Sequence, residues 1–248
     1  MDKALYIAMT GASASLRAQA SVAQNLANAN TVGFQQTLTS TTAVPVTGQG
    51  LSSRVAATPR SLGVSSAAGQ MVNTGGGLDI ALHQDRWLAV QAPDGSTAYT
   101  RAGDLKMTAN GVLTTQGGLP VLDVGGAPLS VPPHQSLTIA GDGTLSIVPQ
   151  GQGPNTITEA GRLKVVTATN RELVRGEDGL MRAAPGASEP PPAAGISLVS
   201  GAVEASNVDA TSMLVSMIQL SRQFEMQVRV LQNGDENARS GNSLLSSR

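Results

Sequence analysis

Residues near the C-terminus recur with the spacing of a helix that packs against a second helix. Within residues 207–232, one stripe of side chains advances in alternating steps of four and three positions, which places them on a single helical face. Leu214, Ile218 and Val228 form a second, weaker apolar face. A terminal helix with two apolar faces suits an assembly better than an isolated globule. The main stripe consists of Met213, Met217, Leu220, Phe224, Gln227 and Leu231.

The first thirty residues show the same alternating spacing of four and three positions. From Asp2 to Asn30 no proline interrupts a predicted helix, and Gly11 is its one weak position. Helices of this length are marginal alone in water, and burying each large apolar side chain contributes only about 1.5–3 kcal/mol. We therefore expect both terminal helices to become stable only against neighbours, although two ordinary amphipathic helices of a mixed domain are the alternative interpretation. The N-terminal stripe consists of Leu5, Met9, Ala12, Leu16, Gln19, Ala23 and Leu26.

Composition excludes several classes of function. Charged residues make up 13% of the chain, about half the usual share, and aromatic residues 2%. A protein surface with so few charged residues suits subunits that pack on copies of one another. The net charge of −1 and the absence of a basic cluster argue against a nucleic-acid partner. There are no cysteines, no apolar run of about 20 residues and no apolar core of a cleavable signal peptide, so we expect neither disulfides nor membrane insertion nor signal cleavage.

The middle of the chain has a residue pattern that predicts extended structure and strands rather than helices. Residues 35–69 are rich in hydroxyl side chains and predict an extended arm, with disorder as the alternative. Residues 70–184 alternate apolar and polar positions between four Asx-Gly pairs, at 94–95, 110–111, 142–143 and 178–179, which favour tight hairpin turns. The expected strands are 78–82, 87–91, 98–101, 105–108, 112–115, 136–140, 144–148, 162–167 and 172–175.

The predicted fold class is therefore α+β, with a discontinuous domain of terminal coiled-coil helices and a central all-β domain of hairpins. Residues 185–195 are rich in proline and predict a loop that cannot join a ladder.

Residue patterns for catalysis or metal binding are not found in the sequence. His83 and His134 lie in separate segments without the spacing of metal ligands. Residues 75–77 are three glycines, but no Lys-Ser/Thr pair follows them as in a phosphate-binding loop. Asp79 and Asp85 are too poorly placed to suggest a pair of glycosidase carboxylates. We expect no enzyme activity, no catalytic residue, no cofactor and no metal.

Three motifs resemble those of bacterial flagellar rod and hook proteins. Residues 25–34 (NLANANTVGF) resemble the signature that ends the N-terminal helix of that family, and residues 200–208 (SGAVEASNV) resemble the signature that opens its C-terminal helix. Residues 78–82 (LDIAL) and 99–103 (YTRAG) resemble its β-domain. The resemblance covers nearly the whole chain. The motif positions are Asn25, Leu26, Asn28, Thr31, Gly33, Phe34, Gly201, Glu204, Ser206 and Asn207.

The resemblance implies a structural subunit that is exported through the flagellar type III export apparatus without cleavage. Members of the family polymerise with copies of themselves and with other rod proteins into the periplasmic shaft of the basal body, which transmits torque and surrounds the export channel. Their paired terminal helices form the inner tube and their β-domain faces outward. We accordingly expect intra- and intersubunit helix packing from Leu5, Met9, Leu16, Leu26, Met213, Met217, Leu220, Phe224 and Leu231.

The implied domain plan is an N-terminal core helix (1–34), an extended arm (35–69), an outer β-domain (70–200) and a C-terminal core helix (201–248). Residues 1–6 and 235–237 look most like the proximal rod proteins of the family. Asn25, Asn28, Glu204 and Asn207 are polar groups suited to capping helices and fixing register. The alternatives are a distal rod protein, a secreted fibre or adhesin, and a secreted polysaccharide-active enzyme.

Overall fold

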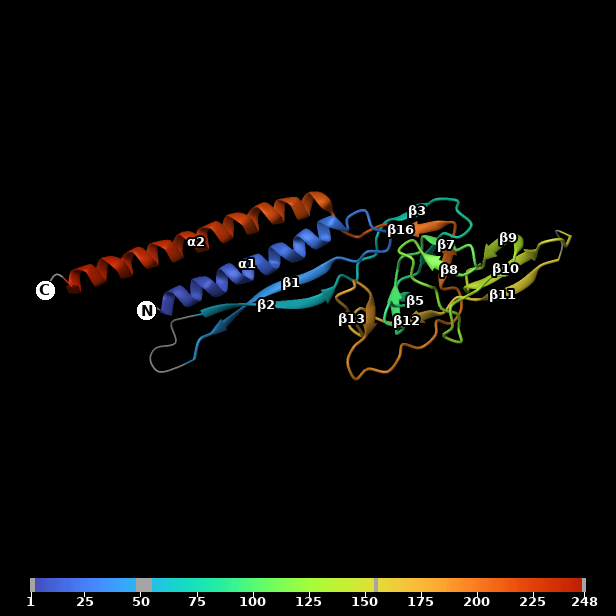
Figure 1. The fold of residues 1–248 in the computed structure, drawn as a ribbon, viewed down its shortest axis with the longest axis horizontal. Helices are drawn as coiled ribbons and strands as arrows, with labels where there is room; N and C mark the ends of the chain where they lie inside the picture. The colour runs from blue at the N-terminus through green and yellow to red at the C-terminus, as the bar shows by residue number, and fades with distance from the viewer. Residues whose placement is uncertain (1–2, 48–54, 154–155, 247–248) are drawn as a thin grey trace. The chain divides into compact units, whose positions relative to one another are not determined.

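The structure, a computed structural model, describes residues 3–47, 55–153 and 156–246. It has a helix near each end of the chain and a β-rich region between them, as the α+β prediction requires (Figure 1). The chain divides into two compact units. The first comprises residues 1–29, 37–62 and 208–248, and the second comprises residues 30–36 and 63–207.

Two antiparallel helices, α1 (Lys3–Ala27) and α2 (Ala210–Ser246), lie side by side in the first unit (Figure 1, blue and red). A Cβ atom at Gly234 would lie 2.7 Å from Leu5 Cδ2, and one at Gly11 would lie 3.1 Å from the Gln227 side chain. Glycine weakens a helix, yet α1 continues through Gly11 and α2 through Gly234. The missing side chains let the two helices approach closely. No helix among the described residues is long and apolar enough to cross a membrane.

The end of α1 differs from the sequence-based expectation. The helix ends at Ala27 rather than at Asn30, because the Asn28 side chain bonds back to the last turn, with Nδ2 donating to Gln24 O at 2.8 Å. Beyond the helix, Gly33 adopts the left-handed conformation, with φ 68°, whereas Asn30 does not. The predicted start at Asp2 lies outside the described residues.

Asp209 caps the start of α2. Its Oδ1 accepts from Thr211 N at 3.0 Å and its Oδ2 accepts from the Ser212 hydroxyl. These two hydrogen bonds lower the pKa of Asp209. The sequence assigned a capping role to Asn207, but the cap lies two residues later.

Residues 37–64 contain two strands, β1 (Thr37–Pro45) and β2 (Val55–Val64), which pair in a two-stranded sheet. β1 also contacts α1. Most positions of both strands are exposed, which accounts for the hydroxyl-rich composition of a segment with little core to fill.

The second unit is built around an antiparallel five-stranded sheet with the order β12-β5-β6-β14-β13. A three-stranded sheet has the order β11-β10-β9, and β7 pairs with β8 in a hairpin. The strands are β5 (Arg86–Gln91), β6 (Thr97–Thr100), β7 (Leu105–Met107), β8 (Leu113–Thr115), β9 (His134–Ile139), β10 (Thr144–Pro149), β11 (Thr158–Arg162), β12 (Val165–Thr167), β13 (Leu173–Arg175) and β14 (Met181–Ala183).

Two further antiparallel pairs join distant parts of the chain. β3 (Met71–Asn73) pairs with β16 (Ala202–Glu204), and β4 (Ile80–Leu82) pairs with β15 (Leu198–Ser200). The segment that leads into α2 is therefore held against the start of the β-rich region. The central region consequently contains long-range strand pairs in addition to the predicted hairpins.

The core of the second unit is apolar and its turns are those expected. Gly95, Gly111, Gly143 and Gly179 all have φ between 77° and 88°, which confirms the four Asx-Gly turns. A smaller buried cluster surrounds Trp87. The larger buried cluster includes Ile80, Leu82, Leu88, Val90, Leu113, Val121, Leu145, Leu163 and Leu198.

Candidate functional site: a polar cluster that joins three motifs

A buried ion pair between Arg101 and Glu204 lies within the second unit. Arg101 Nη2 is 2.5 Å from Glu204 Oε2, and Arg101 Nε donates to the same oxygen at 2.7 Å. Both side chains are only 3% exposed. Arg101 follows β6 and Glu204 ends β16, so the pair connects the five-stranded sheet to the segment before α2.

The remaining donors of Arg101 bind backbone carbonyl groups. Its Nη1 donates to Arg86 O at 2.9 Å and to His83 O at 3.2 Å, and its Nη2 donates to Leu82 O at 3.1 Å. Its guanidinium also lies 5.7 Å from the centroid of the Trp87 ring. Because these acceptors surround the β4–β5 turn, Arg101 fixes the position of that turn.

Glu204 connects the cluster to the N-terminal motif. Its Oε1 accepts from Gly69 N at 2.8 Å, and its backbone oxygen accepts from Gly33 N at 2.7 Å. Gly33 has φ 68°, and a Cβ atom there would lie 2.2 Å from the carbonyl carbon of Arg101. Only glycine fits this close approach, so the NTVGF sequence places its glycine where the loop meets Arg101.

Asn207 holds the chain that follows the N-terminal motif. Its Oδ1 accepts from Gln36 N at 2.7 Å, and its Nδ2 donates to Ala67 O at 2.7 Å. The amide group thus binds two segments as a strand backbone would. Gly201, from the same motif, donates its N–H to Asp79 O at 2.8 Å and accepts from Thr74 N at 2.9 Å.

A second arginine fixes the aromatic residue of the N-terminal motif. The Arg175 guanidinium lies 4.5 Å from the centroid of the Phe34 ring, and Arg175 Nη2 donates to Gln35 O at 2.7 Å. Burial lowers the pKa of Arg175. Asn170 Nδ2 donates to Ser65 O at 2.7 Å on the same side of the motif.

Asn25 makes a comparable contact within the helical unit. The side chain is buried, its Oδ1 accepts from Thr37 N at 2.9 Å, and its Nδ2 donates to Thr37 O at 2.9 Å. The last turns of α1 are therefore bonded to the first residue of β1. A leucine of similar volume would leave both groups of Thr37 without these bonds.

The predicted helix-packing residues fall into two groups. Met213, Met217, Leu220, Phe224 and Leu231 are half-buried in α2, and Leu5 and Leu26 are half-buried in α1. Met9 and Leu16 are 55% and 49% exposed. Of the remaining motif positions, Thr31 is exposed, and Asn28 and Ser206 are half-buried.

The arrangement is structural in its chemistry. Within the described ranges, no three His, Cys, Asp or Glu side chains gather as metal ligands would. Asp79 accepts from Thr74 Oγ1, and His134 Nδ1 lies 2.9 Å from Pro132 O, so these residues participate in local hydrogen bonds. The charges of Arg101 and Glu204 are satisfied by each other and by backbone groups.

The sequence alone did not identify Arg101, Gly69, Asn170 or Arg175 as functional positions. Arg101 lies in a motif that was noted only for its likeness to a β-domain. The sequence holds one signal that points to Arg101: it is a charged residue among strand residues, in a chain with only 13% charged residues.

Three sequence families match separate segments of the chain. Residues 5–35 match "Flagella basal body rod protein", residues 81–147 match "Flagellar hook protein FlgE/F/G D1 domain", and residues 199–244 match "Flagellar basal body rod FlgEFG protein C-terminal". Gly33, Arg101 and Glu204 belong to the first, second and third segment respectively. The polar cluster is therefore the place where the three matched segments meet.

Full-length relatives agree with these matches. The flagellar basal-body rod protein FlgF of Salmonella typhimurium is 43% identical and that of Escherichia coli K12 is 44% identical, each over 99% of both chains. The flagellar basal-body rod protein FlgG of Bacillus subtilis is 32% identical over 87% of this chain and 88% of that protein. The chain belongs to the flagellar basal-body rod protein family, within which it is most like FlgF, and it is a structural subunit rather than an enzyme.

Proposed function

We propose that this chain polymerises through its terminal helices as a subunit of the proximal rod, the periplasmic shaft that transmits torque and surrounds the export channel. Its partners are copies of itself and other rod proteins, after passage through the flagellar type III export apparatus without signal cleavage. Nucleic acid, small-molecule substrates and the lipid bilayer are not partners in this proposal. The proximal role rests on the 43% and 44% identity to two relatives named FlgF, against 32% identity to the FlgG of Bacillus subtilis.

The observation that carries the proposal is an exposed apolar face on α2. These side chains lie on the part of the helix away from the half-buried stripe that includes Met217 and Leu220. Ile218 is 56% exposed and Met226 is 59% exposed. Large apolar side chains gathered on one face mark an interaction surface. The face consists of Leu214, Val215, Ile218, Met226 and Val230.

Helix α1 supplies a second set of exposed apolar residues. Tyr6, Met9 and Leu16 are each about half exposed or more. In the proposal, α1 and α2 pack on each other within a subunit through the half-buried stripe and form a coiled coil with helices of neighbouring subunits through these faces. The roles of the predicted helix-packing residues thereby divide between intrasubunit and intersubunit contacts. The domain plan keeps residues 1–34 and 201–248 as the core of the shaft, 35–69 as an arm and 70–200 as the outer domain.

The test is Ile218→Asp, with Gln223→Asp as the matched control. Both variants add one carboxylate to an exposed position of α2, but Gln223 lies outside the arc of the helix that the five exposed apolar residues of α2 occupy. A buried Ile side chain contributes about 1.5–3 kcal/mol per interface, and a carboxylate buried in its place adds a desolvation cost. We expect Ile218→Asp to leave the unfolding of the purified chain unchanged, to abolish rod assembly and to abolish swimming, while Gln223→Asp assembles.

The measurements are basal-body isolation by electron microscopy, motility in soft agar and urea unfolding of the purified chains. Normal rods and normal swimming with Ile218→Asp would show that this face is not a subunit interface. Loss of assembly with both variants would instead indicate a general intolerance to charge on α2, and would count against the specific face.

A further inference from the structure

The proline-rich segment at residues 189–193 lies along the open edge of the five-stranded sheet. Ala193 N donates to Val165 O at 2.8 Å, and Thr167 N donates to Pro191 O at 2.9 Å. Both bonds belong to β12, whose other edge pairs with β5. The segment, called the proline strap below, was expected to be a loop outside any ladder. Instead it pairs with backbone groups of β12, the edge strand of this sheet.

The register of the strap determines which of its backbone groups face outward. Val166 and Pro192 oppose each other between those two hydrogen bonds. In an antiparallel ladder, the N–H and C=O of such a non-hydrogen-bonded pair point away from the partner strand. The outward donor position is therefore Pro192, followed two residues back by Pro190, and proline has no N–H. A strand approaching from outside finds no donor at either position.

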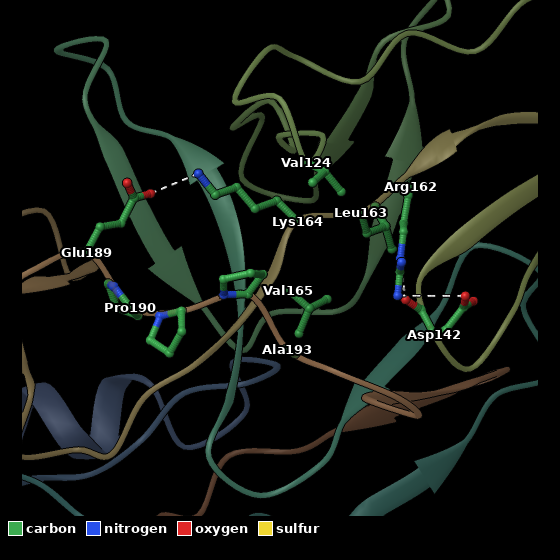
Figure 2. A pocket seen from close by; sticks show the side chains of 11 residues that line it. Val124, Asp142, Arg162, Leu163, Lys164, Val165, Glu189, Pro190 and Ala193 are labelled. Atoms are coloured by element: carbon green, nitrogen blue, oxygen red, sulfur yellow. Dashed lines mark hydrogen bonds and ion pairs between the residues drawn. The ribbon is translucent and has the colours of Figure 1, made fainter.

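Side-chain contacts hold the strap in place. Glu189 Oε1 accepts from Lys164 Nζ at 2.8 Å and lies 3.5 Å from the Tyr99 hydroxyl. Pro190 is buried. Figure 2 shows the Lys164–Glu189 pair on one side of a groove of about 360 Å³ and the Asp142–Arg162 pair on the other. The strap forms one wall of this groove.

We propose that the proline strap closes this sheet edge against pairing with the sheet of a second copy of the chain. An open edge strand is a template for association with another chain, and charged side chains are one common way to block it. Only 13% of this chain is charged, and β12 is Val165–Thr167. The strap supplies the protection that charge supplies elsewhere. At the opposite edge, β13 is only three residues long and is bordered by Arg171 and Glu172.

The test compares two neighbouring substitutions in the full chain, Pro192→Thr and Pro191→Thr. Both positions are exposed, and both changes restore one N–H group. The new N–H of Pro192→Thr points outward, whereas that of Pro191→Thr faces β12. A symmetric pair of edges contains each substitution twice. For Pro192→Thr we expect the self-association constant to rise about 30-fold, equal to about 2 kcal/mol from two hydrogen bonds, and for Pro191→Thr we expect no rise.

Association is measured by sedimentation equilibrium in the Ile218→Asp background and in the unaltered chain, so that association through α2 is separated from association through the sheet edge. Amide hydrogen exchange at Thr167 reports whether the strap stays bound. An equal rise for Pro191→Thr, or no rise for Pro192→Thr, overturns the proposal. If Pro192→Thr releases the strap, Pro192→Ala decides: a rise with Thr167 still protected supports the proposal, and wild-type association overturns it.

Discussion

The Arg101–Glu204 pair allows a quantitative prediction. Glu204→Gln keeps the shape of the side chain but leaves the Arg101 charge without its counter-ion. Both groups are only 3% exposed, so solvent cannot replace the lost interaction. Breaking a buried ion pair by removing one partner costs about 3–5 kcal/mol, out of a total of about 5–15 kcal/mol for a domain. We expect Arg101→Met, which strands the Glu204 carboxylate, to cost a similar amount.

Urea unfolding provides the assay because the chain has a single tryptophan, Trp87, within 5.7 Å of the Arg101 guanidinium. At a slope of about 2 kcal/mol/M, the expected loss lowers the unfolding midpoint by about 2 M. Arg182→Met is the matched control, since it breaks the partly exposed ion pairs of Arg182 with Asp178 at 2.7 Å and with Asp94 at 3.5 Å, and such pairs are worth about 0–1 kcal/mol each.

The double variant Arg101→Met/Glu204→Gln, which combines the two single changes, separates the pair from its surroundings. With no charge left in the cluster, it should be more stable than the sum of the single changes predicts. Additive losses, or a loss below about 1 kcal/mol for Glu204→Gln, would refute the reasoning that these charges compensate each other.

Two further predictions follow from the same unit. In thermal unfolding, Gly33→Ala should destabilise the second unit by clearly more than Gly118→Ala. Both glycines have positive φ, but only at Gly33 would the new Cβ atom meet backbone, 2.2 Å from the carbonyl carbon of Arg101. Equal losses of stability in the two variants would contradict the close approach. Burial and the nearby Glu189 raise the pKa of Tyr99 from 10.0 to about 12. The contribution of protonated Tyr99 to the free energy of unfolding should therefore be fully present below pH 10 and be lost as the pH rises from 10 through about 12. Glu189→Gln should shift the ultraviolet titration of Tyr99 toward lower pH.

Local patterns predicted the elements of this fold because their causes are local. The Asx-Gly pairs predicted turns such as Asn110-Gly111 and Asp142-Gly143, since each places a glycine where φ is positive. Alternation predicted the strands on either side of those turns. The apolar stripe of residues 213–231 predicted both the existence of α2 and the half-buried side of that helix.

The long-range pairings could not be read from the sequence, because no local signal encodes them. β4 pairs with β15, more than a hundred residues later, and Arg101 meets Glu204 across a similar separation. The end of α1 was also misplaced. A side-chain bond from Asn28 to Gln24 O accompanies its end at Ala27, whereas the sequence pattern predicts a helix to Asn30.

The polar cluster of Arg101, Glu204 and Gly33 joins three motifs that lie far apart in the sequence. An apolar contact at the position of Arg101 would tolerate small shifts of the segments around it. A guanidinium bound to Glu204 and to carbonyl groups of the β4–β5 turn does not, because each donor has a fixed direction. Gly33 then binds the backbone oxygen of Glu204, so the same residue that neutralises Arg101 also positions the N-terminal motif. We therefore expect the cluster to select which three segments meet, even where its ion pair adds little net stability.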